Sequence, residues 1–209
     1  MSDSGPEPGE IAAIVLAAGT SSRFGSNKLL HPLTQRGVTM PLAAHSLLSW
    51  LEAFGHIHVV VKPGAEAFCS EVEAALRIVD SGQIRWIVCA EAASGLASSL
   101  ACGVLANHDA AAGWIIGLAD MPAVPSAALI GVRNALKDGA IIAAPYLNNR
   151  RGHPVGFSGQ YYNELIGLQG DVGARHLLER DILSITHVKI DDAGIFADID
   201  IPSDLQRVG

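Results

Sequence analysis

The sequence predicts an α/β protein with a three-layer α/β/α architecture, a mostly parallel sheet and one antiparallel strand. Short apolar runs alternate with amphipathic stretches along the first two thirds of the chain, as in β-α-β units. Hydrophobic residues make up 49% of the chain but aromatic residues only 5%, so small and branched side chains must fill the core, as in buried parallel sheets. A length of 209 residues fits a single domain.

The strands expected in this sheet are short apolar runs that stop at turn-forming residues. They cover residues 11–16, 56–61, 84–88, 114–118 and 140–144. Between the first strand and the first helix, residues 17–39 are rich in Ser, Gly, Asn and Thr, which predicts a long loop.

The helices expected between these strands have apolar residues at helical spacing. They cover residues 41–54, 65–79, 95–106 and 126–137. Gly55 is placed to end the first helix and Ser126 to cap the last one.

The last third of the chain has a different pattern. Residues 148–152 form a turn, after which residues 154–157 can pair back as the antiparallel strand. Helices at 160–166 and 174–180, a strand at 183–190 and a short helix capped by Ser203 complete the domain. The domain is expected to span residues 11–209, after a polar, disordered lead-in at residues 1–10.

Composition excludes several classes of function. A net charge of −7 argues against a broad basic surface for nucleic acid. No apolar run reaches the roughly 20 residues of a membrane span, and the first ten residues lack the pattern of a signal peptide. Three cysteines without a Cys-x-x-Cys pair argue against a disulfide framework and a zinc site. These features favour a cytoplasmic protein without membrane or nucleic-acid partners.

The loop after the first strand has the composition of a phosphate-binding loop. Backbone N–H groups in the Gly- and Ser-rich segment 16–28 can hold an anion, and Arg23 and Lys28 add positive charge. The segment matches neither a Walker A loop nor the Gly-x-Gly-x-x-Gly dinucleotide motif. The alternative is an ordinary loop with two solvated cations.

Carboxylates supply a candidate metal site. Asp120 follows a buried strand, where open α/β sheets bind ligands, and carboxylate oxygens suit Mg²⁺. Asp198 and Asp200 lie on one side of an extended segment, and either could complete the site with Asp120. The alternatives are a turn cap for Asp120 and a solvated edge strand for the other two.

Two further segments are candidates for ligand binding. Gly95 and the hydroxyls of Ser98 and Ser99 lie at a helix start and could bind a base or sugar, or they could serve close packing only. His153 follows a glycine that permits close approach of a ligand, or it is a core histidine. Gly170 to Arg175 opens a helix that could hold an anion, and Asp171 could cap that helix.

Six segments together resemble the molybdenum cofactor cytidylyltransferase family. They are LAAGTSSRFGSNK (16–28), GLASSL (95–100), LADMP (118–122), GHPVGF (152–157), GDVGAR (170–175) and DIDIPSD (198–204). Many nucleotidyltransferases for sugar nucleotides and isoprenoids share the first motif. Its combination with GHPVGF and GDVGAR is more specific.

The resemblance implies a Rossmann-like nucleotidyltransferase fold and transfer of CMP from CTP to the terminal phosphate of molybdopterin, with release of pyrophosphate. It implies Arg23, Lys28 and Asp120 as catalytic residues, Asp120 and Asp200 as ligands of a Mg²⁺ cofactor, and His153, Asp171 and Arg175 near the acceptor. The implied nucleotide-binding residues are Leu16, Ala17, Ala18, Gly19, Thr20, Ser21, Ser22, Arg23, Gly25, Lys28, Gly95, Ser98 and Ser99.

The base and the acceptor have alternatives. GTP users of the family tend to have Leu-Ala-Gly-Gly where this chain has Leu-Ala-Ala-Gly, so Ala18 favours CTP. A guanylyltransferase, or a transferase acting on another phosphate acceptor, keeps the same chemistry. A non-catalytic cofactor carrier that docks on an apo molybdenum hydroxylase, or an NAD(P)H-dependent reductase, would be a different class of protein.

Overall fold

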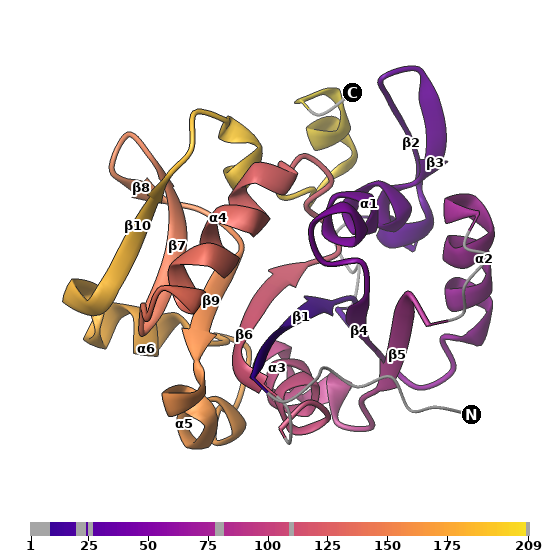
Figure 1. Ribbon diagram of the computed structural model, residues 1–209. Coiled ribbons are helices and arrows are strands. Elements are labelled where there is room, and N and C mark those ends of the chain that lie inside the picture. The colour runs from indigo at the N-terminus through magenta and orange to yellow at the C-terminus, as the bar shows by residue number, and fades with distance from the viewer. Residues whose placement is uncertain (1–8, 20–23, 25–26, 78–81, 109–110, 208–209) are drawn as a thin grey trace.

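A central sheet of eight strands crosses the molecule, with helices on both faces (Figure 1). The computed structural model describes residues 9–19, 24, 27–77, 82–108 and 111–207. The strands of the central sheet are β1 (Glu10–Leu16), β4 (Ile57–Val61), β5 (Ile84–Val88), β6 (Ala111–Leu118), β7 (Ile142–Leu147), β8 (Arg150–Arg151), β9 (Val155–Ser158) and β10 (Ile185–Lys189).

The strand order is β10-β7-β9-β6-β1-β4-β5, and β8 pairs with β7. β9 runs antiparallel to both of its neighbours, β6 and β7, and β8 runs antiparallel to β7. All other neighbouring strands are parallel. The antiparallel strand lies where the sequence predicted one, and the predicted fold class is confirmed.

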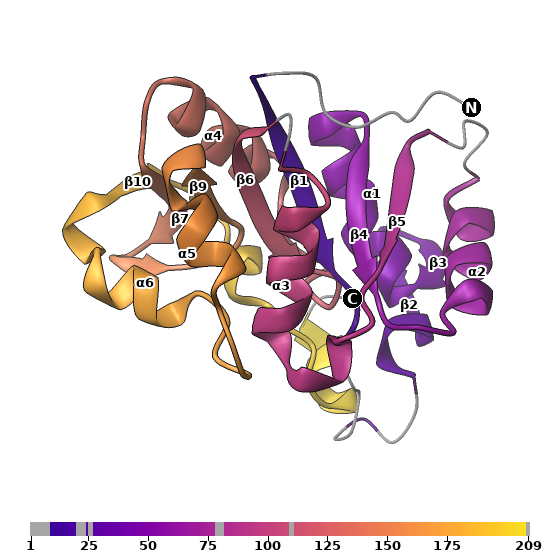
Figure 2. The same cartoon turned by 90° about the horizontal axis from the view of Figure 1, so that it is seen from below.

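The two faces of the sheet carry separate helix layers (Figures 1 and 2). Alternation along β1 sends Ala13 and Val15 to one core and Ile14 and Leu16 to the other. The first core is shared with α1 (Leu42–Phe54), α2 (Glu66–Leu76) and α4 (Ser126–Lys137). The second is shared with α3 (Leu96–Leu105), α5 (Tyr162–Ile166) and α6 (Arg175–Arg180).

Close packing between α1 and the sheet depends on a glycine in β6. A Cβ atom added to Gly117 would come within 2.3 Å of the Trp50 ring. Trp50 is 2% exposed, so the absence of a side chain at Gly117 leaves space for one of the largest groups in the core.

The predicted loop at residues 17–39 contains structure that the sequence did not reveal. β2 (Pro32–Gln35) and β3 (Val38–Pro41) form a two-stranded hairpin, and a 3₁₀ turn covers Lys28–Leu30. Arg36 and Gly37 both have positive φ angles, 50° and 77°, at the hairpin turn. Asn-Gly or Asp-Gly are the usual signals for such a turn, and an arginine is an uncommon residue there.

Two predicted caps are wrong. Ser126 is the first residue of α4, after Pro125, and no side chain caps that helix. Ser203 lies inside the 3₁₀ segment Pro202–Arg207. There the Asp204 side chain accepts hydrogen bonds from the backbone N–H groups of Asp200 and Ile201, each at 3.0 Å.

Most other boundaries agree with the sequence prediction to within two residues. β6 begins three residues before the predicted strand at 114–118, β7 extends three residues beyond the predicted end at 144, and the predicted turn at 148–152 contains β8. α2 ends at Leu76, before Arg77 with a φ of 52°, whereas residues 78 and 79 of the predicted helix lie outside the described residues. Most of the predicted lead-in, residues 1–8, also lies outside them. The remaining 3₁₀ segments are Ala92–Ser94, Gly159–Tyr161, Ile182–Ser184 and Ala193–Phe196.

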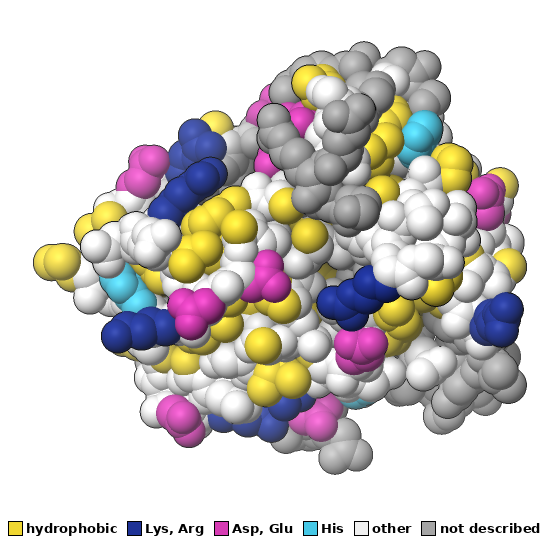
Figure 3. Space-filling model, turned by 90° about the horizontal axis from the view of Figure 1, so that it is seen from above, with side chains coloured by type: hydrophobic (Ala, Val, Ile, Leu, Met, Phe, Trp, Pro, Cys, Tyr) yellow, Lys and Arg dark blue, Asp and Glu magenta, His cyan; other side chains and the backbone are white. Residues whose placement is uncertain are grey.

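The face above α1 and α4 has a mixed surface (Figure 3). Acidic and basic side chains are interspersed with hydrophobic ones over its described part, and charge of one sign does not form a continuous patch there. Among the described helices, none is long and apolar enough to span a bilayer.

Stability is expected to depend on pH through His58 in β4. Burial, together with the nearby charges of Arg85 and His56, lowers the pKa of His58 from 6.5 to about 4. The unfolded chain therefore binds more protons than the native state between these two pH values, so stability falls as the pH falls through this window. Full protonation of this one site costs about 3 kcal/mol.

Urea unfolding of the wild type and of His58→Leu at several pH values between 4 and 7 tests this expectation. The variant should lose less stability on acidification than the wild type. His176→Leu, at an exposed histidine on α6, is the control, and its unfolding free energy should change with pH as that of the wild type does. The same change with pH in all three proteins would exclude His58 as the source of the pH dependence.

Candidate functional site

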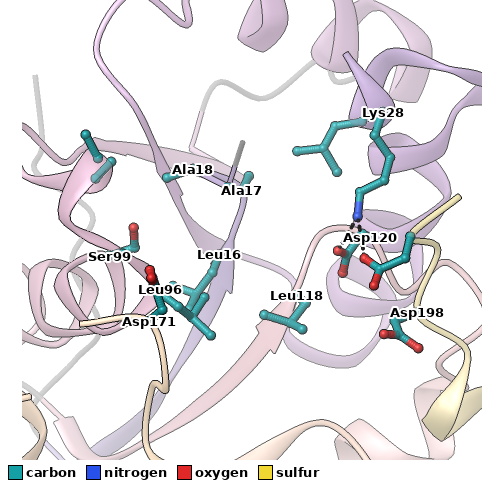
Figure 4. A pocket seen from close by; sticks show the side chains of 16 residues that line it. Leu16, Ala17, Ala18, Lys28, Leu96, Ser99, Leu118, Asp120, Asp171 and Asp198 are labelled. Carbon is teal, nitrogen blue, oxygen red and sulfur yellow. Dashed lines mark hydrogen bonds and ion pairs between the residues drawn. The ribbon is translucent and has the colours of Figure 1, made fainter. Parts of the chain in front are cut away.

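A pocket of about 370 Å³ opens at the carboxyl ends of β1 and β6 (Figure 4). Its position follows from the parallel pairing of these strands, in which Leu16 is in register with Leu118. The lining residues are Leu16, Ala17, Ala18, Gly19, Lys28, Leu29, Ala92, Ala93, Gly95, Leu96, Ser99, Leu118, Asp120, Asp171, Asp198 and Asp200. Segments from five of the six sequence motifs therefore meet at one place.

One end of the pocket is charged. The Nζ atom of Lys28 lies 2.8 Å from Oδ2 of Asp120 and 3.5 Å from Oδ1 of Asp200. The Lys28 side chain is 11% exposed, and a charge with so little access to water is costly without such partners. Figure 4 shows Asp198 beside this group, and the backbone N–H of Ile199 donates to the carbonyl of Asp120 at 3.0 Å.

The charged end fits a divalent cation. Two carboxylates from distant segments already face one cationic group, the Lys28 ammonium. The second oxygen of Asp120, Oδ1, is buried and has no hydrogen-bond partner among the described residues. No group of three or more His, Cys, Asp or Glu side chains in the described ranges is assembled for a metal by itself. A cation held here would thus need further ligands from substrate or water.

The opposite end of the pocket is mostly apolar. Ala17 and Ala18 follow β1, while Ala92 and Ala93 come from the 3₁₀ segment before α3. Leu96 and the 3% exposed Ser99 project from the first turns of α3. This end has the small, apolar walls that suit a flat ring.

A backbone contact joins this end to the loop before α6. Gly95 has φ 117° and ψ 179°, a conformation that is essentially limited to glycine. A Cβ atom at Gly95 would lie 2.3 Å from Oδ1 of Asp171 and 2.6 Å from the carbonyl oxygen of Gly170. That carbonyl accepts a hydrogen bond from the Ala97 N–H at 3.0 Å, so the GLASSL and GDVGAR motifs pack directly against each other.

The three residues predicted to lie near the phosphate acceptor are not all in the pocket. Asp171 lines the pocket, but it does not cap α6, which begins after Ala174 without a side-chain cap. Arg175 is exposed and outside the lining. His153 is also outside the lining, but it is half-buried. Burial lowers the pKa of His153, the charges of Asp120 and Asp198 oppose this, and Arg151 adds to it. His153 is therefore a neutral group close to the charged end.

Other predicted residues lie elsewhere or outside the described part. Ser98 does not line the pocket, and its carbonyl accepts a weak hydrogen bond from the Cys89 thiol at 3.7 Å. Thr20, Ser21, Ser22, Arg23 and Gly25 lie outside the described residues. Sequence reasoning missed Leu29, Ala92, Ala93 and Leu118 as lining residues. An alanine or leucine in an apolar chain carries no signal of ligand contact.

Comparison with known proteins identifies the family of the chain. The family described as the MobA-like NTP transferase domain matches residues 13–187. The chain belongs to this family. The purine catabolism protein PucB of Bacillus subtilis (strain 168) is 32% identical over 202 residues, which cover 95% of each chain.

Solved structures of similar proteins have the same fold. The crystal structure of Rv0371c from Mycobacterium tuberculosis H37Rv is 25% identical, with a TM-score of 0.78 over 96% of this chain and 97% of that one. A nucleotidyl transferase from Methanothermobacter thermautotroptrophicus, Mth528, is also 25% identical, with a TM-score of 0.72 over 95% of both chains. The fold is the Rossmann-like nucleotidyltransferase fold, and these relatives support assignment to the nucleotidyltransferases.

Replacement of Gly95 is expected to disturb the contact between the two motifs. Gly95→Ala combines an unfavourable backbone conformation with a clash against Asp171 and Gly170, and should cost about 1–3 kcal/mol or more of stability. Gly139→Ala is the control, because its φ of 97° imposes strain while no atom lies within 4 Å of the added Cβ. Chemical unfolding should show a larger loss for Gly95→Ala, and equal losses would mean that the clash is relieved without cost.

Proposed function

We propose that this protein transfers CMP from CTP to the terminal phosphate of molybdopterin and releases pyrophosphate. Membership of the MobA-like NTP transferase family and similarity to a nucleotidyl transferase support the reaction class. The observation that carries the proposal is the polarity of the pocket. A lysine and carboxylates lie at one end, where a triphosphate would bind, and small apolar residues lie at the other, where a base would fit.

In the proposed reaction, a phosphate oxygen of the acceptor attacks the α-phosphorus of CTP and forms a new P–O bond. The bond between the α-phosphorus and the oxygen that bridges it to the β-phosphate breaks, and its electron pair leaves with pyrophosphate. The attacking oxygen is already anionic, so the protein needs no strong general base. Catalysis then depends on alignment of the reactants and on neutralisation of charge.

Lys28 has the main role among the described residues. Its ammonium group lies at the charged end and can bind a phosphate oxygen of the nucleotide. Asp120 and Asp200 orient this ammonium, as their distances of 2.8 and 3.5 Å indicate. We assign Arg23 to the same task, although it lies outside the described residues.

Mg²⁺ is the proposed cofactor, with Asp120 and Asp200 as its protein ligands. The buried, unpartnered Oδ1 atom of Asp120 supports this assignment. The bound ion would offset the negative charge of the triphosphate and of the pyrophosphate that leaves.

The recipient of the finished cofactor is a separate part of the proposal. The relative PucB is named as a purine catabolism protein. By analogy with that name, we propose that the product is passed to a molybdenum hydroxylase that oxidises a purine ring. Pull-down of such an enzyme in its apo form tests this step independently of nucleotide transfer.

The chain is expected to bind CTP in preference to GTP. Ala18 lines the apolar end with a methyl group where GTP users of the family tend to have glycine, and a methyl-sized difference is worth about 1–3 kcal/mol. Calorimetry with Mg²⁺ and CTP, GTP, ATP or NADPH measures this preference. Ala18→Gly should reduce the difference in binding affinity between CTP and GTP. Tighter binding of GTP by the wild type would overturn the choice of base, and binding of NADPH alone would favour a reductase.

Asp120→Asn is expected to lower turnover by about 10²–10³-fold while the protein stays folded. The amide keeps the shape of the side chain but loses the charge that orients Lys28 and would hold Mg²⁺. Pyrophosphate release from CTP and molybdopterin measures the loss, and thermal unfolding checks the fold. Asp191→Asn removes an exposed carboxylate as the control and should retain activity. Near-normal turnover of a folded Asp120→Asn protein would remove Asp120 from the site.

A further inference from the structure

We propose that Asp171 recognises the exocyclic amino group of the pyrimidine base and thereby makes the pocket selective for cytosine over uracil. The inference rests on the proposed function, because it takes a cytidine nucleotide as the donor. It also moves Asp171 from the acceptor side, where the sequence resemblance put it, to the base side of the same pocket.

The position of Asp171 relative to the charged end supports this role. Figure 4 shows Asp171 beside Leu96 and Ser99, whereas Lys28, Asp120 and Asp198 lie across the pocket. Leu16 and Leu118 lie between the two groups. A nucleotide whose phosphates bind the Lys28 ammonium directs its base away from it, towards α3 and Asp171.

The backbone next to Asp171 is anchored against the start of α3. The Oδ1 atom of Asp171 lies directly against Gly95, at 2.3 Å from the position that a Cβ atom would take there. The preceding residue, Gly170, is anchored by its hydrogen bond from the Ala97 N–H at 3.0 Å. Among the described residues, no hydrogen bond or ion pair engages this carboxylate, so its lone pairs can accept from a ligand.

The chemistry of a carboxylate makes it selective between the two pyrimidines. An ionised aspartate can only accept hydrogen bonds. Cytosine has an amino group at C4, which donates, whereas uracil has a carbonyl oxygen there, which accepts. Cytosine would gain a charge-assisted hydrogen bond, and uracil would direct lone pairs at a negative charge. Ser99 cannot replace this discrimination, because a hydroxyl donates and accepts.

The same carboxylate does not by itself exclude adenine or guanine, since both carry amino groups. The methyl group of Ala18, which lines the pocket where GTP users of the family tend to have glycine, would narrow the space for a purine instead. Two separate features would therefore define the donor: Ala18 disfavours the larger guanine, and Asp171 selects the amino-bearing pyrimidine.

Replacement of Asp171 by asparagine tests the inference. The amide offers both donors and an acceptor, so Asp171→Asn can pair with either base. Calorimetry with Mg²⁺ should give at least about tenfold tighter binding of CTP than of UTP for the wild type, the value of one hydrogen bond to a charged group that is partly exposed. The ratio should fall to about threefold or less in Asp171→Asn. Asp171→Ala should lose the preference too, because it removes the acceptor without adding a donor.

Asp138→Asn is the charge-matched control. Asp138 is an exposed carboxylate at the end of α4, so this variant should keep the wild-type ratio. A variant effect that appears only as a raised KM for molybdopterin, with an unchanged ratio of CTP to UTP, would return Asp171 to the acceptor side. Equal binding of CTP and UTP by the wild type would overturn the inference and leave the proposed reaction standing. Failure of the wild type to bind CTP would instead overturn the proposed function.

Discussion

The parallel pairing of β1 with β6 decides where the pocket lies and which residues reach it. Leu16 and Leu118 are in register, so the chain leaves both strands at the same edge of the sheet. The segment after β1 leads to Lys28, and the segment after β6 leads to Asp120. Nζ of Lys28 and Oδ2 of Asp120 are therefore 2.8 Å apart, although the two residues are 92 positions apart in the sequence. A strand pair with a shifted register would separate the lysine from its carboxylate, and the charged end would be lost.

The charged and apolar ends of the pocket are stabilised in different ways. A lysine as little exposed as Lys28 is costly unless carboxylates surround it, so Asp120 and Asp200 stabilise the charged end by pairing with this ammonium group. The apolar end depends on backbone instead. Gly95 provides a conformation and a space that no other residue provides, and the loop at Gly170 lies against it. The structure of that end thus depends on the close approach of Gly95 to Gly170.

Individual residues show how far the candidate site could be predicted. Lys28 could be found because it adds positive charge to the Gly- and Ser-rich segment after the first strand, and Asp120 because it comes directly after a buried strand. Asp171 could be found as a candidate but not placed. Its neighbours Gly95 and Ser99 lie on another helix, and their proximity results from packing on the second core. Ala92 and Ala93, which also line the pocket, carried no signal, because alanine is common in any core of this class.

The sequence by itself determined the alternation of strands and helices, the antiparallel strand and the segments from which the site is built, since periodicity, glycine and proline act over a few residues. Tertiary structure decided the rest. The hairpin at residues 32–41 turns at an arginine with positive φ, a conformation that local propensity disfavours. Its two strands pair with each other in a segment for which the composition predicts a loop. The contact between the GLASSL and GDVGAR segments depends on how α3 and the loop before α6 pack over one face of the sheet. Such contacts join residues far apart in sequence, and no local pattern encodes the distance between them.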